Sequence, residues 1–133
     1  MSRVSSIHHV NFLVRDLSEA AARFARELGL EFGPEQTLAA RGVVTRRARL
    51  GATWLVLVQP LDPTSPPGQR LTRHGEGVFL LSFAVDDLDA ALASGMALGP
   101  ERRGLDGWRV ADLTGLSGET TVVQLCEDKG HSH

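Results

Sequence analysis

The sequence predicts an α+β fold made of two tandem β-α-β-β-β modules. The main observation is an internal repeat, in which residues 7–17 match residues 78–88 with one constant offset. Each copy alternates apolar and polar residues as a half-buried strand does, and each ends in Asp-Leu, at Asp16 and at Asp87, a pattern typical of a helix start. Further strand-like segments follow each predicted helix, which indicates that the whole unit occurs twice.

The first module is expected over about residues 6–60 and begins with a strand and a helix. Residues 6–14 alternate as a strand, which places His8 and His9 on opposite faces. In a regular strand these two side chains are therefore not expected to hold one metal ion together. Asp16 is expected to cap the helix, whose apolar residues recur at helical spacing.

Three further strands are expected in this module, over residues 30–38, 42–50 and 53–59. The last two are close enough in sequence to form a hairpin around Gly51. Residues 61–77 are rich in Pro and Gly, and we expect a linker there with a short helical turn over 69–74.

The second module is expected over about residues 78–127. It opens with a strand that places Leu80 and Ser82 on one face, followed by a helix that Asp87 caps and that runs to about Leu98. Its remaining strands are expected within 99–105 and over 108–113 and 120–127. Residues 128–133 are expected to be disordered, and residues 1–133 to form a single domain.

Composition limits the classes of partner. The chain has 133 residues, of which 42% are hydrophobic and 23% charged, with a net charge of −2. This balance gives no basic field for nucleic acid or for an acidic membrane surface, and no apolar run is long enough to span a bilayer. Cys126 is the only cysteine, which excludes an internal disulfide and favours a reducing, cytoplasmic location.

Several motifs occur in a recognisable order. The first is an opening strand at 7–10 with an Asp-Leu cap at 16–17, and the second is Arg-Gly-Val at 41–43, which leads to Leu-Gly at 50–51. An apolar strand that ends in Pro follows at 54–60. The last is Gly-Glu-Gly at 75–77, which leads to Val-Asp-Asp at 85–87. In this order the chain resembles the vicinal oxygen chelate superfamily, which includes glyoxalases, bleomycin-resistance proteins and dioxygenases. The likeness is closest to the methylmalonyl-CoA epimerase branch.

The resemblance implies that the two modules form an incomplete barrel around a cleft, often in a homodimer. In metal-using members four ligands come from the first and last strands of both modules. Carried over residue by residue, those positions are His9, Val56, Leu80 and Gln124. The position of the epimerase base carries over to Ala40. Because Val and Leu offer no lone pair, no metal or other cofactor is expected, and only His9 and Gln124 remain as candidates for weak divalent binding.

Strand alternation predicts which residues line the cleft. The predicted ligand-binding residues are His9, Asn11, Arg47, Trp54, Val56, Leu80, Ser82 and Gln124. For His9, Arg47 and Trp54 the sequence leaves two interpretations of the side chain's role open. His9 either makes internal hydrogen bonds or contacts a ligand; Arg47 lies either on a solvated strand face or against an anion. Trp54 either fills the core or forms a pocket wall.

Two functions follow from the resemblance and from these residues. The first is binding of a small organic ligand, with Arg47 suggesting an anionic one, without a tightly bound metal, as in bleomycin-resistance proteins. The alternative is a lyase or isomerase of the glyoxalase or acyl-CoA epimerase type, acting on a small carbonyl or thioester substrate through a metal or through His9 as the catalytic residue. The sequence leaves the choice between binding protein and enzyme open.

Overall fold

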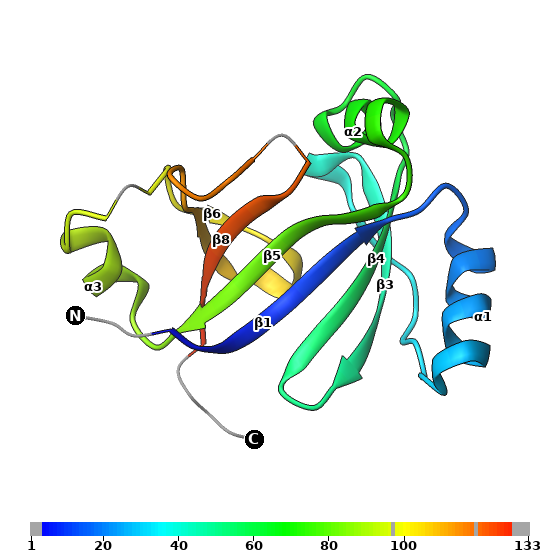
Figure 1. Cartoon of the computed structure of the whole chain (residues 1–133), viewed down its shortest axis with the longest axis horizontal. Coiled ribbons are helices and arrows are strands. Elements are labelled where there is room, and N and C mark those ends of the chain that lie inside the picture. Colours follow the sequence, from blue (N-terminus) through cyan, green and yellow to red (C-terminus); the bar gives the residue numbers. More distant parts are fainter. Residues whose placement is uncertain (1–3, 97, 119, 129–133) are drawn as a thin grey trace.

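The computed structural model describes residues 4–96, 98–118 and 120–128, and its main feature is one curled eight-stranded sheet (Figure 1). The strands lie in the order β2-β3-β4-β1-β5-β8-β7-β6. One module supplies β1 to β4 and the other β5 to β8, so the two modules share a single sheet. Both the α+β class and the half-barrel architecture that the sequence predicts are confirmed.

The first half contains one long helix and four strands. Its elements are β1 (Val4–Leu13), α1 (Leu17–Leu28), β2 (Gln36–Leu38), the 3-10 turn η1 (Ala39–Arg41), β3 (Val43–Leu50) and β4 (Thr53–Pro60). The second half follows the helix α2 (Pro66–His74). Its elements are β5 (Gly77–Val85), α3 (Leu88–Ala93), β6 (Arg102–Arg103), the 3-10 turn η2 (Leu105–Gly107), β7 (Arg109–Asp112) and β8 (Val122–Glu127).

The capping residues in both copies of the repeat act as predicted. The Asp16 carboxylate accepts a hydrogen bond from the Glu19 backbone N–H at 3.0 Å, and the Asp87 carboxylate accepts one from Ala90 at 3.0 Å. Each bond satisfies one of the unpaired N–H groups of the first helical turn. Gly29 ends α1 in the left-handed conformation, with φ 68°.

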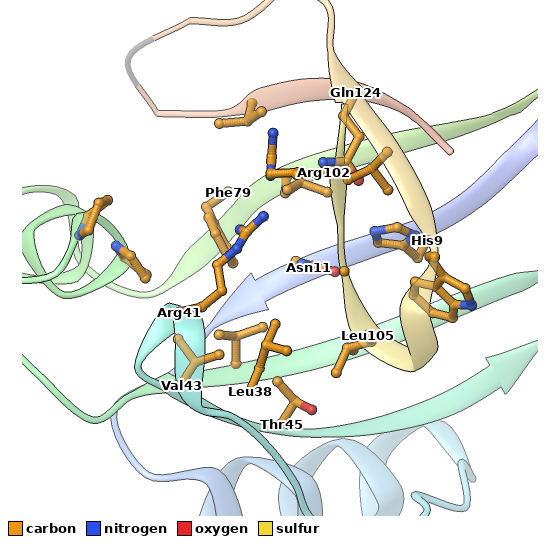
Figure 2. Close-up of a pocket in the computed structure, with 18 of the residues that line it drawn as sticks. His9, Asn11, Leu38, Arg41, Val43, Thr45, Phe79, Arg102, Leu105 and Gln124 are labelled. Carbon is orange, nitrogen blue, oxygen red and sulfur yellow. The ribbon is translucent and has the colours of Figure 1, made fainter. Parts of the chain in front are cut away.

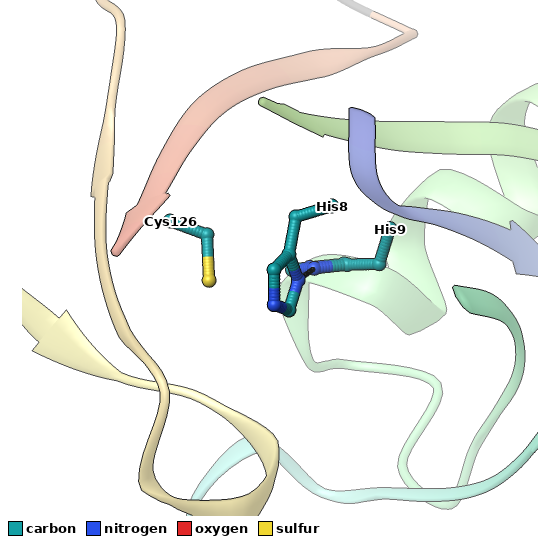
Figure 3. Close-up of side chains that lie close together, drawn as sticks. All are labelled: His8, His9 and Cys126. Atoms are coloured by element: carbon teal, nitrogen blue, oxygen red, sulfur yellow. Dashed lines mark hydrogen bonds between the residues drawn. The ribbon is translucent and has the colours of Figure 1, made fainter. Parts of the chain in front are cut away.

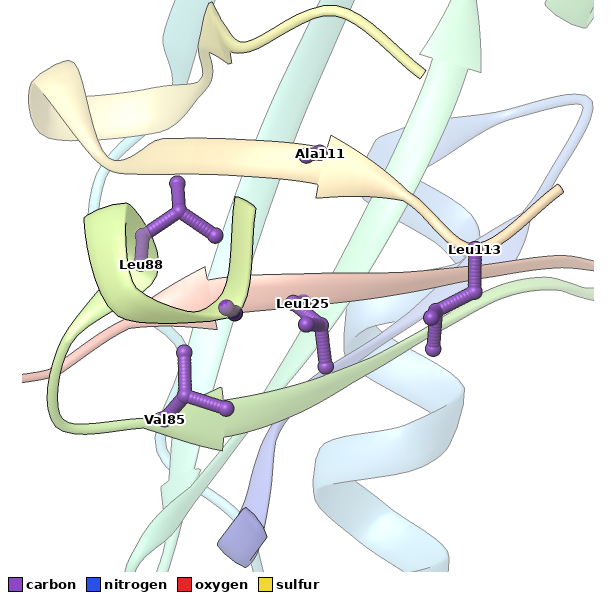
Figure 4. Close-up of a cluster of buried hydrophobic side chains, with 6 residues drawn as sticks. Val85, Leu88, Ala111, Leu113 and Leu125 are labelled. Carbon is purple, nitrogen blue, oxygen red and sulfur yellow. The ribbon is translucent and has the colours of Figure 1, made fainter. Parts of the chain in front are cut away.

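Two equivalent apolar clusters attach the helices to the sheet at its opposite ends. The cluster between α3 and the sheet consists of the buried side chains of Val85, Leu88, Ala91, Ala111, Leu113 and Leu125 (Figure 4). The cluster between α1 and the sheet consists of those of Val14, Leu17, Ala20, Ala21 and Leu57. A third cluster, made of Leu13, Val43, Val56 and Val58, lies on the other face of the sheet.

Three predicted elements differ from the observed ones. The predicted strand 30–38 is reduced to Gln36–Leu38 and one isolated bridge at Phe32, because Pro34 lacks the N–H that a continuous ladder needs. Helix α3 ends at Ala93 and not at Leu98, since Gly95 adopts a φ of 86°.

The predicted linker contains more helix than the expected turn over 69–74. Helix α2 has nine residues, and the Ser65 hydroxyl caps it by accepting from the Gly68 N–H at 3.1 Å. Two prolines fill its first positions, where a missing N–H has no cost.

Within the described residues no helix is long and apolar enough to cross a membrane. The predicted disordered tail, apart from residue 128, lies outside the described residues.

The central pairing of β1 with β5 is antiparallel and irregular. His9 lies opposite Ser82, and Asn11 lies opposite Leu80. The register shifts at three points of β1, between Val4 and Ser6, between Ile7 and His9, and between Asn11 and Phe12. Each shift leaves one residue unpaired as a β-bulge does, so simple alternation of side chains fails at three points on the central strands.

Candidate functional site

A cavity of about 230 Å³ lies on the face of the sheet opposite helix α1 (Figure 2). All eight strands contribute at least one lining residue, and α2, η1 and η2 close its sides. Most of the lining is apolar, with Leu38, Val43 and Leu105 as examples. Because the lining comes from both modules, the cavity exists only when the whole sheet is assembled.

Half of the predicted ligand-binding residues line this cavity. These are His9, Asn11, Leu80 and Gln124. The other four lie on the predicted face but outside the lining. Val56 and Ser82 are fully buried in the sheet, while Trp54 pairs with His9 and Arg47 lies near Trp108, two residues that do line the cavity.

The four positions that the family resemblance links to a metal lie in two neighbouring rows of the sheet. His9, Ser82 and Gln124 form one row, and Val56, Asn11 and Leu80 form the next. One imidazole and one neutral amide are the only donors that the four positions supply. A catalytic zinc-type site uses about three protein ligands, so these residues do not fit the metal that the family implies.

The environment of His9 keeps its imidazole neutral. Its side chain is 4% exposed, and burial lowers its pKa to about 3, with the charge of His8 contributing and a hydrogen bond to Gln124 opposing. The His9 Nδ1 lies 2.9 Å from the His8 Nδ1, so one imidazole donates to the other. His9 therefore makes the internal hydrogen bonds of one interpretation while it also faces the cavity, as the other requires.

The prediction that His8 and His9 point to opposite faces is wrong. The bulge between Ile7 and His9 turns both side chains toward the interior, and the two rings meet edge to face with centroids 5.1 Å apart. Cys126 of β8 lies beside them, so that one donor atom from each of the three side chains falls within 4.8 Å of the others (Figure 3). This cluster could hold a metal ion at a place that the family positions do not describe.

Arg47 is held between two tryptophan rings. Its guanidinium lies 4.3 Å from the Trp54 ring centroid and 5.1 Å from that of Trp108, and it forms an ion pair with Asp106. Within this ion pair the Arg47 guanidinium donates a hydrogen bond to the Asp106 carboxylate, and this bond holds the pKa of Asp106 below its ordinary value. Neither interpretation from the sequence describes this arrangement, in which the Arg47 charge is already paired.

Trp108 links this ion pair to the histidines. Its ring stacks on His9 with centroids 4.8 Å apart and meets His8 edge to face at 4.6 Å. Trp108 also lines the cavity. It therefore forms a shared wall between the cavity and the cluster of His8, His9 and Cys126.

Sequence reasoning missed the charged residues of the cavity. Arg41 of η1, Arg70 of α2 and Arg102 of β6 line it, and Arg102 forms a 2.9 Å ion pair with Asp112. In Figure 2 Arg41 and Arg102 lie together, away from His9. The sequence offered little signal for them, because η1 was not expected, α2 was expected only as a short turn over 69–74, and β6 only as a strand somewhere within 99–105.

Some buried polar atoms of this region lack a partner. Arg70 Nη1, Asn11 Oδ1 and Ser82 Oγ have no hydrogen bond to any described residue. Buried polar groups are normally satisfied, so unpaired ones near a cavity suggest contacts that a ligand would complete.

Comparisons with known proteins agree with this fold. Residues 8–111 match the family model for the Glyoxalase/Bleomycin resistance protein/Dioxygenase superfamily. The uncharacterized protein YqjC of Bacillus subtilis is 25% identical over 139 residues, covering 98% of this chain and 97% of that protein. The ethylmalonyl-CoA/methylmalonyl-CoA epimerase of Cereibacter sphaeroides is 32% identical over 89 residues, which cover 66% of each chain.

Solved structures align over nearly the whole chain. The methylmalonyl-CoA epimerase from Mycobacterium tuberculosis has a TM-score of 0.83 at 26% identity, covering 96% of this chain and 90% of its own. A variant of the Streptomyces coelicolor methylmalonyl-CoA epimerase, in complex with 2-nitronate-propionyl-CoA, has a TM-score of 0.84 at 24% identity, covering 96% of this chain and 100% of its own.

Proposed function

The chain belongs to the glyoxalase/bleomycin resistance protein/dioxygenase superfamily, and we propose that its cleft binds a small organic anion. The apolar body of the ligand would lie against the strands, and its carboxylate or phosphate would be held by arginines. Binding would not depend on a metal at the four strand positions that the family resemblance implies.

The observation that carries this proposal is the group of arginines in an otherwise apolar cavity. Arg41, Arg70 and Arg102 contribute three guanidinium groups, and Asp112 is the one carboxylate among the described lining residues. Burial and the neighbouring charge of Arg102 lower the pKa of Arg41, and the charge of Asp112 opposes this shift. An anion beside Arg41 would add a second compensating charge, and guanidinium groups bind carboxylates and phosphates bidentately.

Two unpaired atoms support a bound ligand at this place. Arg70 Nη1 is a buried donor with no partner within the described chain, and Asn11 Oδ1 is a buried acceptor in the same condition. An acidic group near Arg70 and a hydroxyl or amide group near Asn11 would satisfy both. The volume of about 230 Å³ suits a small acid or the acyl end of a larger ester.

The test is a thermal-shift and calorimetric screen with matched ligand pairs. Straight-chain carboxylates, dicarboxylates and alkyl phosphates are compared with the corresponding primary amides and alcohols. We expect some acids to raise the melting temperature while their neutral partners do not, because a ligand that binds only the folded state stabilises it.

Two arginine variants on one helix provide the control. Arg70→Met removes a cavity guanidinium, whereas Arg73→Met removes an exposed one that does not line this cavity. We expect the first variant to weaken binding of the selected acid by at least about tenfold, in line with a charge-assisted hydrogen bond, and the second to bind as the wild type does. Equal effects of both variants, or no stabilising acid in the screen, would refute the proposal.

A second candidate function is isomerase or lyase chemistry on a small thioester. The likeness to methylmalonyl-CoA epimerases over nearly the whole chain favours it, as does the presence of His9 at the family position. Against it, His9 with a pKa of about 3 is a weak base at neutral pH, and Ala40 occupies the position of the epimerase base. Proton exchange at the α-carbon of methylmalonyl-CoA in deuterated buffer, followed by NMR, would detect such activity.

A further inference from the structure

We propose that His8, His9 and Cys126 form a binding site for a transition-metal ion of the zinc class. The three side chains are 8%, 4% and 0% exposed, and their donor atoms lie within 4.8 Å of one another. Figure 3 shows Cys126 extending from β8 toward the two imidazole rings of β1. Only His9 belongs to the four positions that the family resemblance implies, so this is a different site.

The sheet is built so that side chains of β1 and β8 can meet. Strand β5 lies between these strands, and the residues that it places in this region are small. Ser82 pairs with His9 on one side and with Gln124 on the other, and Ala84 pairs with Cys126. Because Ser82 and Ala84 fill little space, the longer histidine and cysteine side chains converge above them.

The bulge in β1 is the feature that makes the site. In a regular strand His8 and His9 would face opposite sides of the sheet. The register shift between Ile7 and His9 brings both imidazoles to one side, with their Nδ1 atoms 2.9 Å apart. Bulges often re-aim a side chain next to a functional site.

The donor distances suit a tetrahedral ion after small side-chain movements. Zinc–nitrogen bonds of about 2.0–2.1 Å and zinc–sulfur bonds of about 2.3 Å place the ligand atoms of such a site about 3.3–3.6 Å apart. The observed separations, from 2.9 Å to at most 4.8 Å, bracket that range. The hydrogen bond between the two Nδ1 atoms requires a proton on one of them, and that imidazole would adopt its other tautomer to bind the ion.

The two imidazoles and the thiolate are ligands that borderline-soft transition-metal ions prefer. Two imidazoles and one thiolate are typical ligands of zinc, cobalt, nickel and copper, and they would leave a fourth position open. Burial lowers the pKa of both imidazoles, which favours their neutral, lone-pair-bearing forms, but it raises the pKa of the Cys126 thiol to about 12. Cys126 would lose its thiol proton to solvent as the metal–sulfur bond forms.

Neighbouring groups fix the rings and balance the charge. The Trp108 ring packs on both histidines, at 4.6 and 4.8 Å between centroids, which restricts their orientation. Arg47 and Arg49 oppose a cation near His8, whereas the charge of Asp128 favours one. Arg47 is itself paired with Asp106, which reduces its effect.

Cobalt(II) titration of the full chain under reducing conditions tests the site. A cobalt–thiolate bond gives a near-ultraviolet charge-transfer band that imidazole and carboxylate ligands do not give. All proteins carry His131→Ala and His133→Ala, so that the histidines near the C-terminus do not bind cobalt. We expect a band that saturates at one ion per chain and that zinc displaces.

Matched variants separate this site from other cobalt binding. Cys126→Ala should abolish the band, and His8→Gln, which keeps the thiol, should weaken cobalt binding by at least about tenfold. His74→Ala, which removes an exposed histidine of α2, should leave the titration unchanged. No band at saturating cobalt, a band that survives Cys126→Ala, or a cobalt affinity that His8→Gln leaves unchanged in folded protein, would each refute the proposal. Binding of organic acids is measured separately, so failure of one proposal does not decide the other.

Discussion

Replacement of Gly68 by alanine should destabilise the protein although alanine is the better helix former. Gly68 is a buried residue in the first turn of α2, the helix that carries Arg70 into the cavity. A methyl group at this position would lie 2.2 Å from the Asp62 carbonyl oxygen and 2.8 Å from the Pro63 Cα atom. Both are backbone atoms, so the helix or the preceding turn must move.

The size of the effect follows from two opposing contributions. Restoring an ordinary contact of about 3.4 Å requires a movement of roughly 1.2 Å, and overpacking of this kind costs about 1–3 kcal/mol. Alanine recovers at most about 1 kcal/mol over glycine inside a helix. Because the atoms that the methyl group would meet belong to the backbone, we take the upper half of that cost and expect a net loss of about 1–2 kcal/mol in the free energy of unfolding.

Urea unfolding followed by circular dichroism measures this loss. Gly115→Ala is the matched control, because its added methyl group would meet no described atom within 4 Å and it should change the stability by less than about 1 kcal/mol. A Gly68→Ala protein that is as stable as the wild type would refute the reasoning, since it would mean that α2 is not packed against residues 62 and 63.

Three further predictions concern the core, a helix cap and an ion pair. Leu88→Ala should cost about 2–5 kcal/mol by urea unfolding, because the Leu88 side chain of α3 is fully buried in the apolar cluster between this helix and the sheet. Asp16→Ala should cost about 1 kcal/mol in the same assay, because it removes the acceptor for the Glu19 N–H. The hydrogen bond from Arg47 lowers the pKa of Asp106. The ionised Asp106 carboxylate therefore stabilises the folded protein above about pH 4, and this stabilisation is lost as the pH falls through its lowered pKa. The stability difference between wild type and Asp106→Asn should therefore shrink between about pH 6 and pH 3, and a constant difference would contradict this.

The parts of the fold that could be predicted depend on local signals. The repeat, the two aspartate caps and the hairpin around Gly51 are each set by residues close in sequence, and each is present in the structure. The parts that were predicted poorly are the stretch before β2 and helix α2. There proline and glycine indicate irregular chain, and only contacts with distant residues decide which conformation forms.

The site was predictable only where the strands are regular. Alternation placed Asn11, Leu80 and Gln124 at the cavity, but it could not reveal the three register shifts between β1 and β5. A bulge arises from pairing between strands about seventy residues apart, so no local pattern reports it. For that reason His8 was assigned to the wrong face, and Phe79, which the shift between Asn11 and Phe12 leaves unpaired and which lines the cavity, was not expected there.

The strand order has a consequence for the behaviour of the protein at high concentration. The two outermost strands of the sheet, β2 and β6, are only three and two residues long, and β6 consists of Arg102 and Arg103. Long, unpaired outer strands recruit other chains into intermolecular sheets, whereas short or charged ones offer few backbone groups for such pairing. The sheet is thus terminated on both sides in a way that disfavours edge-to-edge aggregation, although its central strands are long and rich in apolar residues.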